Sequence, residues 1–447
     1  MTYEEAIDWL LSFADFERSG RFQDRPDVAP MLALLERLGN PHLGRATVHI
    51  AGSKGKGSVA AMVACIADQE CPGSVSLYTS PHLHSYTERI AGMDDRETRD
   101  EFAWIVDQKL RPAVEAIEPK IGERSLVTFD LLTALFFVFS RDRAAQMQVL
   151  ETGLGGRVDS TNVFVKKEVV VITPISLEHT SILGDSVEQI AREKAAIITP
   201  GCTVLMSPQP EEDAARVVRD FADAARARIV DVSREYRWRK LSHDLRGQEI
   251  LIEGRSGVIK TRLPLLGAHQ IENAATAVAA IEGLRKKRFL LWVDTSFDRD
   301  VVKGLESVRW PGRMEVLHEH PLVICDGAHN RDSAGRLRET LVDYFACDRA
   351  LFIIGCGSDK DIDGLAEELA PLASHVIAVR SNHPRAMAPE RITEAFGRLS
   401  IDTEIGDSVG GAVDKAIAVG GESALICVAG SLFVAAEARE HFGLTKA

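Results

Sequence analysis

The stretch "HIAGSKGKGSVAAM" occupies residues 49–62, between an apolar strand-like run and a segment with apolar residues at helical spacing. A glycine-rich turn at such a place can direct backbone N–H groups at an anion, and the helix N-terminus adds partial positive charge. The strict phosphate-loop pattern is G-x-x-x-x-G-K-[ST]. Here Gly57 follows Lys56, and the hydroxyl arrives one place later, at Ser58.

Three glycines and two lysines fall within six residues of this stretch, and two lysines this close would repel each other unless an anion lay between them. A glycine-rich turn without a ligand would rarely need that composition. We therefore expect a nucleotide-binding loop. The residues expected to contact the phosphates are Gly52, Ser53, Gly55, Lys56, Gly57 and Ser58.

Short β-branched runs alternate with longer helix-like segments through the first part of the chain. Because these runs are apolar and separated by helices, they predict a parallel sheet covered on both faces. The expected strands are "ATVHIAG", "SVSLYTS", "MQVLETG", "EVVVITPI" and "TVLMS". From about residue 225 to 265, the alternating runs "ARIVDV", "EILIEG" and "GVIKTRLPL" predict a small antiparallel patch.

The strand–helix rhythm restarts after "VRWPGRME", with the runs "LVICDGA", "LFIIGCG", "HVIAVRS" and "ALICVAGS". Helical sequence follows each run, which predicts a second, smaller α/β domain. We expect an α/β protein with domains at residues 1–298 and 313–447, joined by a hinge at 299–312.

The composition of the 447 residues is 45% apolar and 27% charged, which is typical of a globular protein. The net charge of −13 disfavours a nucleic-acid binder. Seven scattered cysteines without a C-x-x-C pair are typical of a reduced, cytosolic protein. The acidic N-terminus resembles no secretion signal, and apolar runs such as "ALFFVF" are too short to span a bilayer. We expect a cytoplasmic monomer that binds small molecules, not nucleic acid or membrane.

The loop, written A-G-[ST]-x-G-K-G-[ST], resembles that of the Mur ligase superfamily of ATP-dependent amide-forming ligases. With several further motifs in the expected order, the chain resembles the folylpolyglutamate synthase/dihydrofolate synthase family nearly from end to end. The resemblance implies a P-loop ATPase domain of the Mur-ligase central type with a parallel sheet, followed by a smaller Rossmann-like domain. It also implies ATP and two Mg²⁺ ions as cofactors.

Two motifs supply candidate magnesium ligands. In "LYTSPHLHSYTERI" (77–90), the resemblance implies that Ser80 gives its hydroxyl to Mg²⁺, although a strand ending in an X-Pro turn would look similar. In "LETGLGGRVDSTN" (150–162), Glu151 ends an apolar strand, where a carboxylate is costly unless it meets a cation. A hard oxygen ligand beside a phosphate loop suits magnesium. A glycine-rich turn with no ligand is the alternative.

The segment "ITPISLEHTSILGDSVEQIAREKAAII" (172–198) contains His179 and Lys194. The resemblance makes His179 a ligand of a second Mg²⁺ and matches Lys194 to a lysine that is carbamylated in relatives. The family's usual aspartate before the histidine is Glu178 here. A structural histidine and a solvated lysine are the plainer alternatives.

Residues in other motifs are assigned to substrate and nucleotide by the same resemblance. Phe129, in "TFDLLTAL", matches the pteridine side, although packing in a helix core competes with that role. The residues expected at the pteroate substrate are Phe129, Val158, Asp159 and Ser160. Those expected at ATP beyond the loop are Asn273 in "HQIENAATAV", Arg313 in "WPGRME" and Asp326 and His329 in "ICDGAHN", with Asn330, Asp359 and Lys360 nearby. Capping of surface helices explains any one of these residues but not the set.

The predicted function is ATP-dependent ligation of L-glutamate to a pteroate or folate carboxylate through an acyl phosphate. The predicted catalytic residues are Lys56, Glu151, His179 and Lys194. The alternatives are a Mur-type ligase of peptidoglycan precursors and, in another class, a P-loop ATPase acting as a switch. The motifs "SPHL" and "GLGGRVDSTN" favour folate, and a switch predicts a conventional phosphate loop without a second domain carrying "DGAHN".

Overall fold

The computed structural model describes residues 1–19, 27–70, 72–90, 98–121, 126–286 and 297–445. A six-stranded parallel sheet organises the first half, and its central strand β1 leads into the phosphate loop. In sheet order the strands are β2 (Val75–Tyr78), β3 (Met147–Glu151), β1 (Ala46–Ala51), β4 (Val169–Ile172), β5 (Thr203–Met206) and β6 (Arg228–Asp231).

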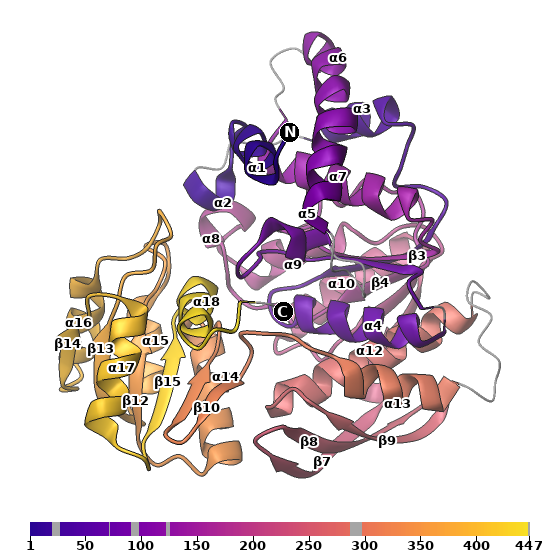
Figure 1. The fold of residues 1–447 in the computed structure, drawn as a ribbon. Helices are drawn as coiled ribbons and strands as arrows, with labels where there is room; N and C mark the ends of the chain where they lie inside the picture. The colour runs from indigo at the N-terminus through magenta and orange to yellow at the C-terminus, as the bar shows by residue number, and fades with distance from the viewer. Residues whose placement is uncertain (20–26, 71, 91–97, 122–125, 287–296, 446–447) are drawn as a thin grey trace.

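Helices cover both faces of this sheet because its strands bury alternate residues on opposite sides. In β4, Val169 and Val171 face a core with α4 (Lys56–Glu70) and α12 (Ala268–Lys286). Val170 and Ile172 face α9 (Val187–Ala195) and α10 (Glu212–Ala224) on the other side. Further helices build a separate core near β2 and β3 (Figure 1). They include α1 (Tyr3–Leu11), α3 (Ala29–Arg37), α5 (Thr98–Ile105), α6 (Arg111–Ile121) and α7 (Thr128–Asp142).

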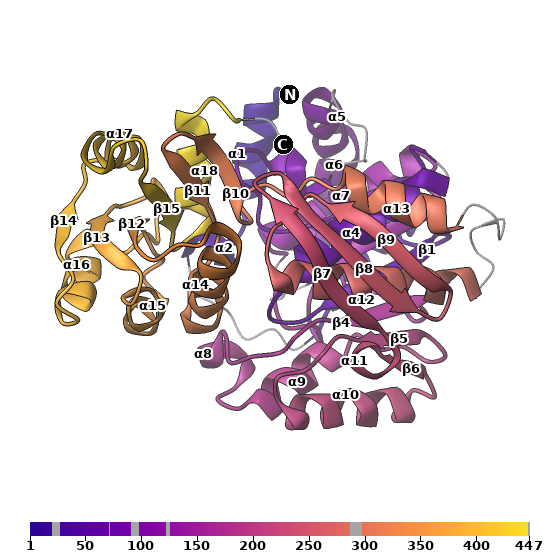
Figure 2. The same ribbon diagram turned by 90° about the horizontal axis from the view of Figure 1, so that it is seen from below.

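The expected antiparallel patch is a three-stranded sheet of β7 (Arg237–Asp244), β8 (Gly247–Gly254) and β9 (Gly257–Leu263). This sheet lies below the first one in Figure 1 and faces the viewer in Figure 2. The assignment of "ARIVDV" to this patch was wrong, because β6 pairs in parallel with β5. As an edge strand β6 is only partly buried, which gives it the alternation of an antiparallel strand. Strand β7 was not predicted, because it is almost wholly exposed and its sequence is polar.

The second half forms another six-stranded sheet, in which the four predicted strands are parallel neighbours. Two edge strands were not predicted, because β10 carries exposed residues and β14 is only three residues long. The order is β10 (Glu315–Glu319), β11 (Leu322–Cys325), β15 (Leu425–Ala429), β12 (Ala350–Ile354), β13 (Ala373–Ala378) and β14 (Thr403–Ile405). The covering helices are α14 (Arg331–Phe345), α15 (Ile362–Leu369) and α16 (Pro389–Gly397) on one face, and α17 (Val409–Gly420) and α18 (Leu432–His441) on the other.

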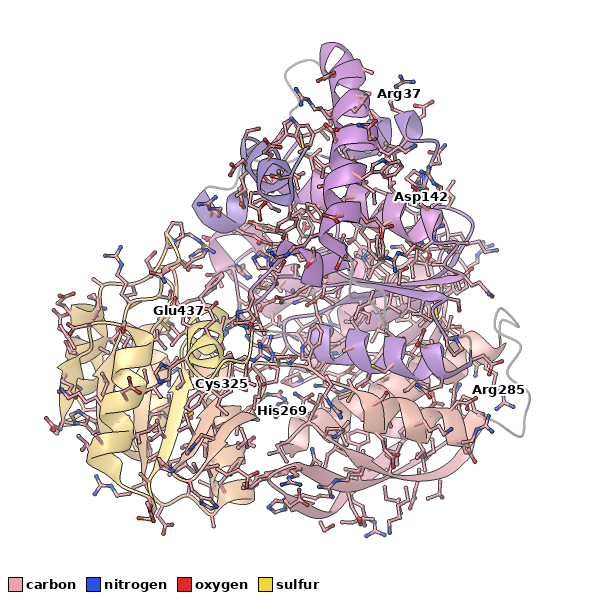
Figure 3. All side chains as sticks on the ribbon, in the orientation of Figure 1. Arg37, Asp142, His269, Arg285, Cys325 and Glu437 are labelled. Atoms are coloured by element: carbon pink, nitrogen blue, oxygen red, sulfur yellow. The ribbon has the colours of Figure 1, made fainter. Side chains whose placement is uncertain are left out.

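Most of the expected hinge is helical. The helix α13 (Phe297–Ser307) packs so closely on α4 that a Cβ at Gly304 would lie 2.4 Å from Cα of Ile66. The segment that passes between the two large sheets is therefore residues 308–314, and the domain boundaries themselves stay a prediction. His269 lies where the two halves meet (Figure 3), and it lines the cleft between them.

Side chains also join the two halves away from the cleft. Tyr344 Oη on α14 donates to Gln248 Oε1 on β8 at 2.7 Å. Arg439 Nη1 on α18 lies 2.7 Å from His84 Nε2, in the loop that follows β2. Six cysteines of the described residues are buried, and none of these six forms a disulfide. Across the described ranges, every helix is either too short or too polar to cross a membrane.

Candidate active site

The phosphate loop connects β1 to the start of α4 at Lys56. Two of its glycines have positive φ angles, 150° at Gly52 and 83° at Gly55. A Cβ at Gly52 would lie 1.9 Å from Oγ1 of Thr173, and one at Gly55 would lie 2.5 Å from Oδ1 of Asn273. Both positions therefore require glycine, for the backbone conformation and for space.

Hydrogen bonds to the loop after β4 hold the phosphate loop in place. Ser53 N donates to the carbonyl of Pro174 at 2.9 Å, and Ser53 Oγ donates to the carbonyl of Ser176 at 3.0 Å. Lys56 Nζ donates to the carbonyl of Gly52 at 3.1 Å. The hydroxyl of Ser53 is thus engaged within the protein, and the loop is organised around its own backbone.

Three lysines converge on one carboxylate behind the loop. Lys194 Nζ lies 2.8 Å from Glu178 Oε1, and Lys54 Nζ lies 3.7 Å from Glu178 Oε2. Burial alone would raise the pKa of Glu178, but Lys194, Lys56 and Lys54 together hold it well below its ordinary value. Burial lowers the pKa of Lys194 and of Lys54. Three cations facing one anion leave a surplus of positive charge, which suits a polyanionic ligand.

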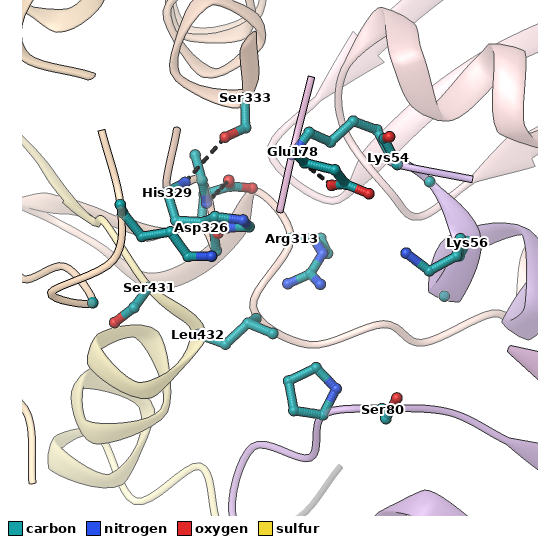
Figure 4. Close-up of a pocket in the computed structure, with 18 of the residues that line it drawn as sticks. Lys54, Lys56, Ser80, Glu178, Arg313, Asp326, His329, Ser333, Ser431 and Leu432 are labelled. Atoms are coloured by element: carbon teal, nitrogen blue, oxygen red, sulfur yellow. Dashed lines mark hydrogen bonds and ion pairs between the residues drawn. The ribbon is translucent and has the colours of Figure 1, made fainter. Parts of the chain in front are cut away.

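A cavity of about 370 Å³ lies in front of this cluster, with walls from both halves of the chain. Figure 4 shows Arg313 in the middle of this cleft, with Lys56 on one side and Asp326 and His329 on the other. Gly52 contributes its carbonyl to Lys56 and to Lys194. The other predicted nucleotide contacts line the cavity, namely Ser53, Gly55, Lys56, Gly57, Ser58, Asn273, Arg313, Asp326 and His329.

The two predicted residues of the "DGAH" motif are held by backbone groups. Asp326 Oδ2 accepts a hydrogen bond from Met314 N at 2.9 Å, and its Oδ1 accepts one from Ala328 N at 2.8 Å. Asp326 therefore fixes the end of the linker to β11. His329 Nδ1 lies 2.8 Å from the carbonyl of Gly327, and burial lowers the pKa of His329 to about 3. Its imidazole is neutral near pH 7.

Glu151 and Ser80 lie side by side at the ends of β3 and β2. Ser80 N donates to Glu151 Oε2 at 3.2 Å. Burial raises the pKa of Glu151, and Lys56 is the strongest opposing influence. A buried carboxylate beside a hydroxyl and a phosphate loop fits Mg²⁺, which takes few protein ligands and completes its shell with water and substrate phosphates.

The residues predicted for a second Mg²⁺ do not fit one in the form described. Burial lowers the pKa of His179 to about 4, so its imidazole is neutral and able to bind a metal. Lys194, however, is an ammonium group that donates to Glu178 and to the carbonyl of Gly52, both at 2.8 Å. Within the described ranges, no three histidine, cysteine or carboxylate groups are placed to hold a metal. Of the two predicted ligands, His179 alone is therefore able to bind an ion unless Lys194 is modified.

A second cavity, of about 1060 Å³, is lined by all four residues predicted to contact the pteroate substrate: Phe129, Val158, Asp159 and Ser160. The Phe129 ring packs on the glycine-rich turn after β3, since a Cβ at Gly153 would lie 2.5 Å from its Cζ. Exposed apolar side chains of Leu177 and Ile182 stand on another wall. The cavity thus combines apolar and polar walls, as a ligand with an aromatic body requires.

Asp159 and Ser160 make hydrogen bonds within the protein. Asp159 Oδ2 accepts one from Leu154 N at 2.9 Å, and its Oδ1 accepts one from Thr161 N at 3.0 Å. Ser160 Oγ donates to Asp130 Oδ1 at 2.7 Å. Asp159 therefore fixes the shape of the glycine-rich turn, whatever contact it makes with a substrate.

The two cavities adjoin, because Gly153, Leu154, Glu178, His179 and His329 line both of them. Sequence reasoning missed two groups of residues here. The Arg89 guanidinium, on the wall of the second cavity, forms hydrogen bonds with both carboxylate oxygens of Glu17, at 3.1 and 2.6 Å. On the second half, the His383 and Phe433 rings stack 4.0 Å apart beside Ser381. The "TERI" motif contained Arg89 but gave no sign of its partner.

Two family models match the chain. The Mur ligase middle domain matches residues 50–281, and the model described as "Mur ligase, glutamate ligase domain" matches residues 312–432. The chain is 32% identical over 409 residues to a dihydrofolate synthase/folylpolyglutamate synthase of Bacillus subtilis, covering 88% of each chain. The structure of Mycobacterium tuberculosis folylpolyglutamate synthase complexed with ADP superposes with a TM-score of 0.86 at 29% identity, covering 98% of this chain and 99% of that one.

The two halves around the cleft are therefore Mur ligase domains. A further relative, a probable bifunctional folylpolyglutamate synthase/dihydropteroate synthase of Haloferax volcanii, is 33% identical over 453 residues. That match covers 98% of this chain but 50% of the relative, so the chain spans about half the relative's length. The chain belongs to the folylpolyglutamate synthase/dihydrofolate synthase family of Mur ligases.

Proposed function

We propose that the protein is an ATP-dependent ligase that joins L-glutamate to the carboxylate of a pteroate or folate. The observation that carries the proposal is the junction of the two cavities at Gly153, Leu154 and His179. A nucleotide on the phosphate loop and an aromatic acid in the larger cavity would meet at that junction. The γ-phosphoryl group of ATP would be transferred to the acid there, giving ADP and an acyl phosphate.

The chain's own groups at the phosphate end neutralise charge. Lys56 exchanges its contact with the Gly52 carbonyl for the phosphates, and Arg313 approaches from the linker. Glu151 and Ser80 would hold Mg²⁺, which would offset the negative charge that develops on the phosphates. The surplus charge of Lys54 and Lys194 draws the triphosphate to the loop. Phosphoryl transfer depends mainly on such positioning and charge, so this set of residues suits it.

At the acid end, Phe129 and the glycine-rich turn would hold the aromatic body of the substrate. Leu177 and Ile182 would cover it from the opposite wall. The incoming amine needs a third position, on the second half of the chain. We place it near Ser381 and Arg385, which line the cleft beside the N-terminus of α18. The amine attacks the acyl carbon, the C–O bond to phosphate breaks, and the nitrogen loses a proton.

An acyl phosphate has to be protected from water, and walls from both halves of the chain provide that protection. The relative from Haloferax volcanii pairs a folylpolyglutamate synthase with a dihydropteroate synthase in one chain. A dihydropteroate-forming reaction would supply the acid that a dihydrofolate synthase uses. This pairing supports dihydropteroate as one substrate of the present chain.

The test supplies purified protein with ATP, Mg²⁺ and L-glutamate, and adds dihydropteroate, tetrahydrofolate or a peptidoglycan-precursor carboxylate in separate reactions. Mass spectrometry of the products identifies the acid that gains glutamate. We expect a glutamyl product from at least one pterin and ADP release that depends on both pterin and glutamate. ADP release without either substrate would support the switch-like ATPase, and product from the third acid alone would support the peptidoglycan ligase.

A further inference from the structure

The glycine that follows the loop lysine is not required by the backbone. Gly57 is the second residue of α4, and its φ angle lies outside the left-handed region. Glycine is among the least favourable residues inside a helix. A Cβ at this position would lie 2.7 Å from Cζ2 and 3.2 Å from Cε2 of Trp310, and 3.3 Å from Oε2 of Glu151. Gly57 is therefore glycine because the indole occupies the space.

Trp310 lies in the linker at 308–314, which leaves α13 and enters β10. Its half-buried ring packs against the core that contains α4 and α12. Two residues later, the carbonyl of Gly312 accepts a hydrogen bond from Gly327 N at 3.0 Å, in the second half. Trp310 is thus held by the first half and Gly312 by the second, with only Pro311 between them.

The side chain that follows this short connection is the one at the centre of the cleft. Arg313 Nη1 donates to the carbonyl of Gly312 at 3.0 Å, and a Cβ at Gly327 would lie 2.6 Å from Arg313 Nη1. The position of Arg313 relative to Lys56 therefore depends on where Trp310 fixes the linker. The contact between Trp310 and Gly57 thus joins the linker that carries Arg313 to the residue next to Lys56.

We propose that Trp310 is a positioning residue that fixes the linker against Gly57 and thereby places Arg313 over the phosphates. The inference rests on the proposed function only because that function defines the reaction whose turnover is measured. The phosphates themselves are held by Lys56 and the loop, which Trp310 does not replace. Loss of the indole should therefore lower turnover more than it weakens nucleotide binding.

A double-mutant cycle tests this steric relation. Gly57→Ala places a methyl group against the indole and should lower kcat by about a hundredfold or more, as misplaced reactive groups do. Trp310→Leu should lower kcat by about tenfold and change the KM for ATP by less than about twofold. The double variant should exceed Gly57→Ala in kcat by about tenfold, because the smaller side chain removes the clash.

Trp238 provides the matched control, since it is a half-buried tryptophan on the same core cluster, carried by β7. Trp238→Leu should keep kcat within about twofold of wild type and should not rescue Gly57→Ala. Thermal melting verifies that each variant is folded. A double variant no more active than Gly57→Ala, or equal kcat in the two Trp→Leu variants, would overturn the inference.

A binding measurement separates this inference from the proposed reaction. Addition of ADP with Mg²⁺ should change the intrinsic tryptophan fluorescence of the wild type and of Trp238→Phe, but not of Trp310→Phe. This result is expected whatever acid the enzyme uses. If ADP with Mg²⁺ changes the fluorescence of Trp310→Phe as much as that of the wild type, the indole does not sense the loop. That result would contradict the inference even if ligation of glutamate to a pterin is demonstrated.

Discussion

Replacing Glu178 by glutamine removes the carboxylate that pairs with Lys194 and Lys54 behind the phosphate loop. Glutamine has nearly the same shape, so the change tests charge and not volume. Lys194 is 2% exposed and Glu178 is 11% exposed, so water screens the pair little. In the variant, Lys194 and Lys54 would both lose their anionic partner.

Removing one partner of a buried ion pair typically costs about 3–5 kcal/mol, because the remaining charge stays desolvated. Lys194 would keep its 2.8 Å hydrogen bond to the carbonyl of Gly52, which partly compensates the loss. We therefore expect the free energy of unfolding to fall by an amount at the lower end of this range, about 3 kcal/mol. This loss corresponds to a decrease of roughly a hundredfold in the folding equilibrium constant. A bound nucleotide would return negative charge to the cluster. Saturating ADP should therefore reduce the difference in the free energy of unfolding between the variant and the wild type.

Urea unfolding followed by circular dichroism measures this difference, with and without ADP. Glu188→Gln is the matched control, because Glu188 lies on α9 and pairs with Arg192 and Arg216 at the surface. The control should leave the urea midpoint unchanged, as exposed ion pairs contribute little. If Glu178→Gln unfolds at the same urea concentration as the control, the lysines do not depend on this carboxylate and the charge argument is wrong.

Three further changes test separate parts of the structure. Tyr344→Phe removes the buried hydrogen bond to Gln248 Oε1 and should lower the free energy of unfolding by about 1–2 kcal/mol in urea titrations. Burial lowers the pKa of Lys167 from 10.5 to about 7, so between these pH values the unfolded chain holds more protons than the folded one. The free energy of unfolding should therefore rise with pH, by up to about 1.4 kcal/mol per pH unit. Lys167→Met should abolish this rise. Phe129→Leu should raise the KM for the pterin by about tenfold with the KM for ATP unchanged, because the ring forms the cavity wall; a loss of stability without a change in KM would assign Phe129 to the helix core instead.

The sequence predicted the central strands well because burial on both faces makes them apolar throughout. Strands β1, β4 and β5 bury every residue. Edge strands lack that signal, so β6 was placed in the wrong sheet and β7 was missed. The order of the strands also had to come from the structure, because hydrogen bonding between distant segments leaves no mark on local hydropathy.

At the site, motifs predicted which residues face the cleft but not what those residues touch. Asp159 and Asp326 were assigned to ligands, yet both carboxylates accept hydrogen bonds from backbone N–H groups of neighbouring turns. Lys194 was matched to a modified lysine, but its ammonium is paired with Glu178. A motif specifies a residue type at a position, whereas the partner depends on where other segments fold. The roles of these residues toward substrate and metal stay predictions.

The departure of the loop from the strict phosphate-loop pattern has a steric cause with a chemical consequence. In the strict pattern, the hydroxyl directly after the lysine binds Mg²⁺. A Cβ at position 57 would lie 2.7 Å from Cζ2 of Trp310, so the chain has glycine there and this position supplies no oxygen. Ser58 lines the same cavity as Glu151, but one residue further along the helix its side chain leaves the axis about 100° away from that of position 57. Ser80 also lies beside the buried carboxylate of Glu151, because its backbone N–H donates to Glu151 Oε2 at 3.2 Å. On our proposal, Ser80 in the loop after β2 therefore provides the hydroxyl ligand that position 57 does not provide, because the linker residue Trp310 packs against Gly57.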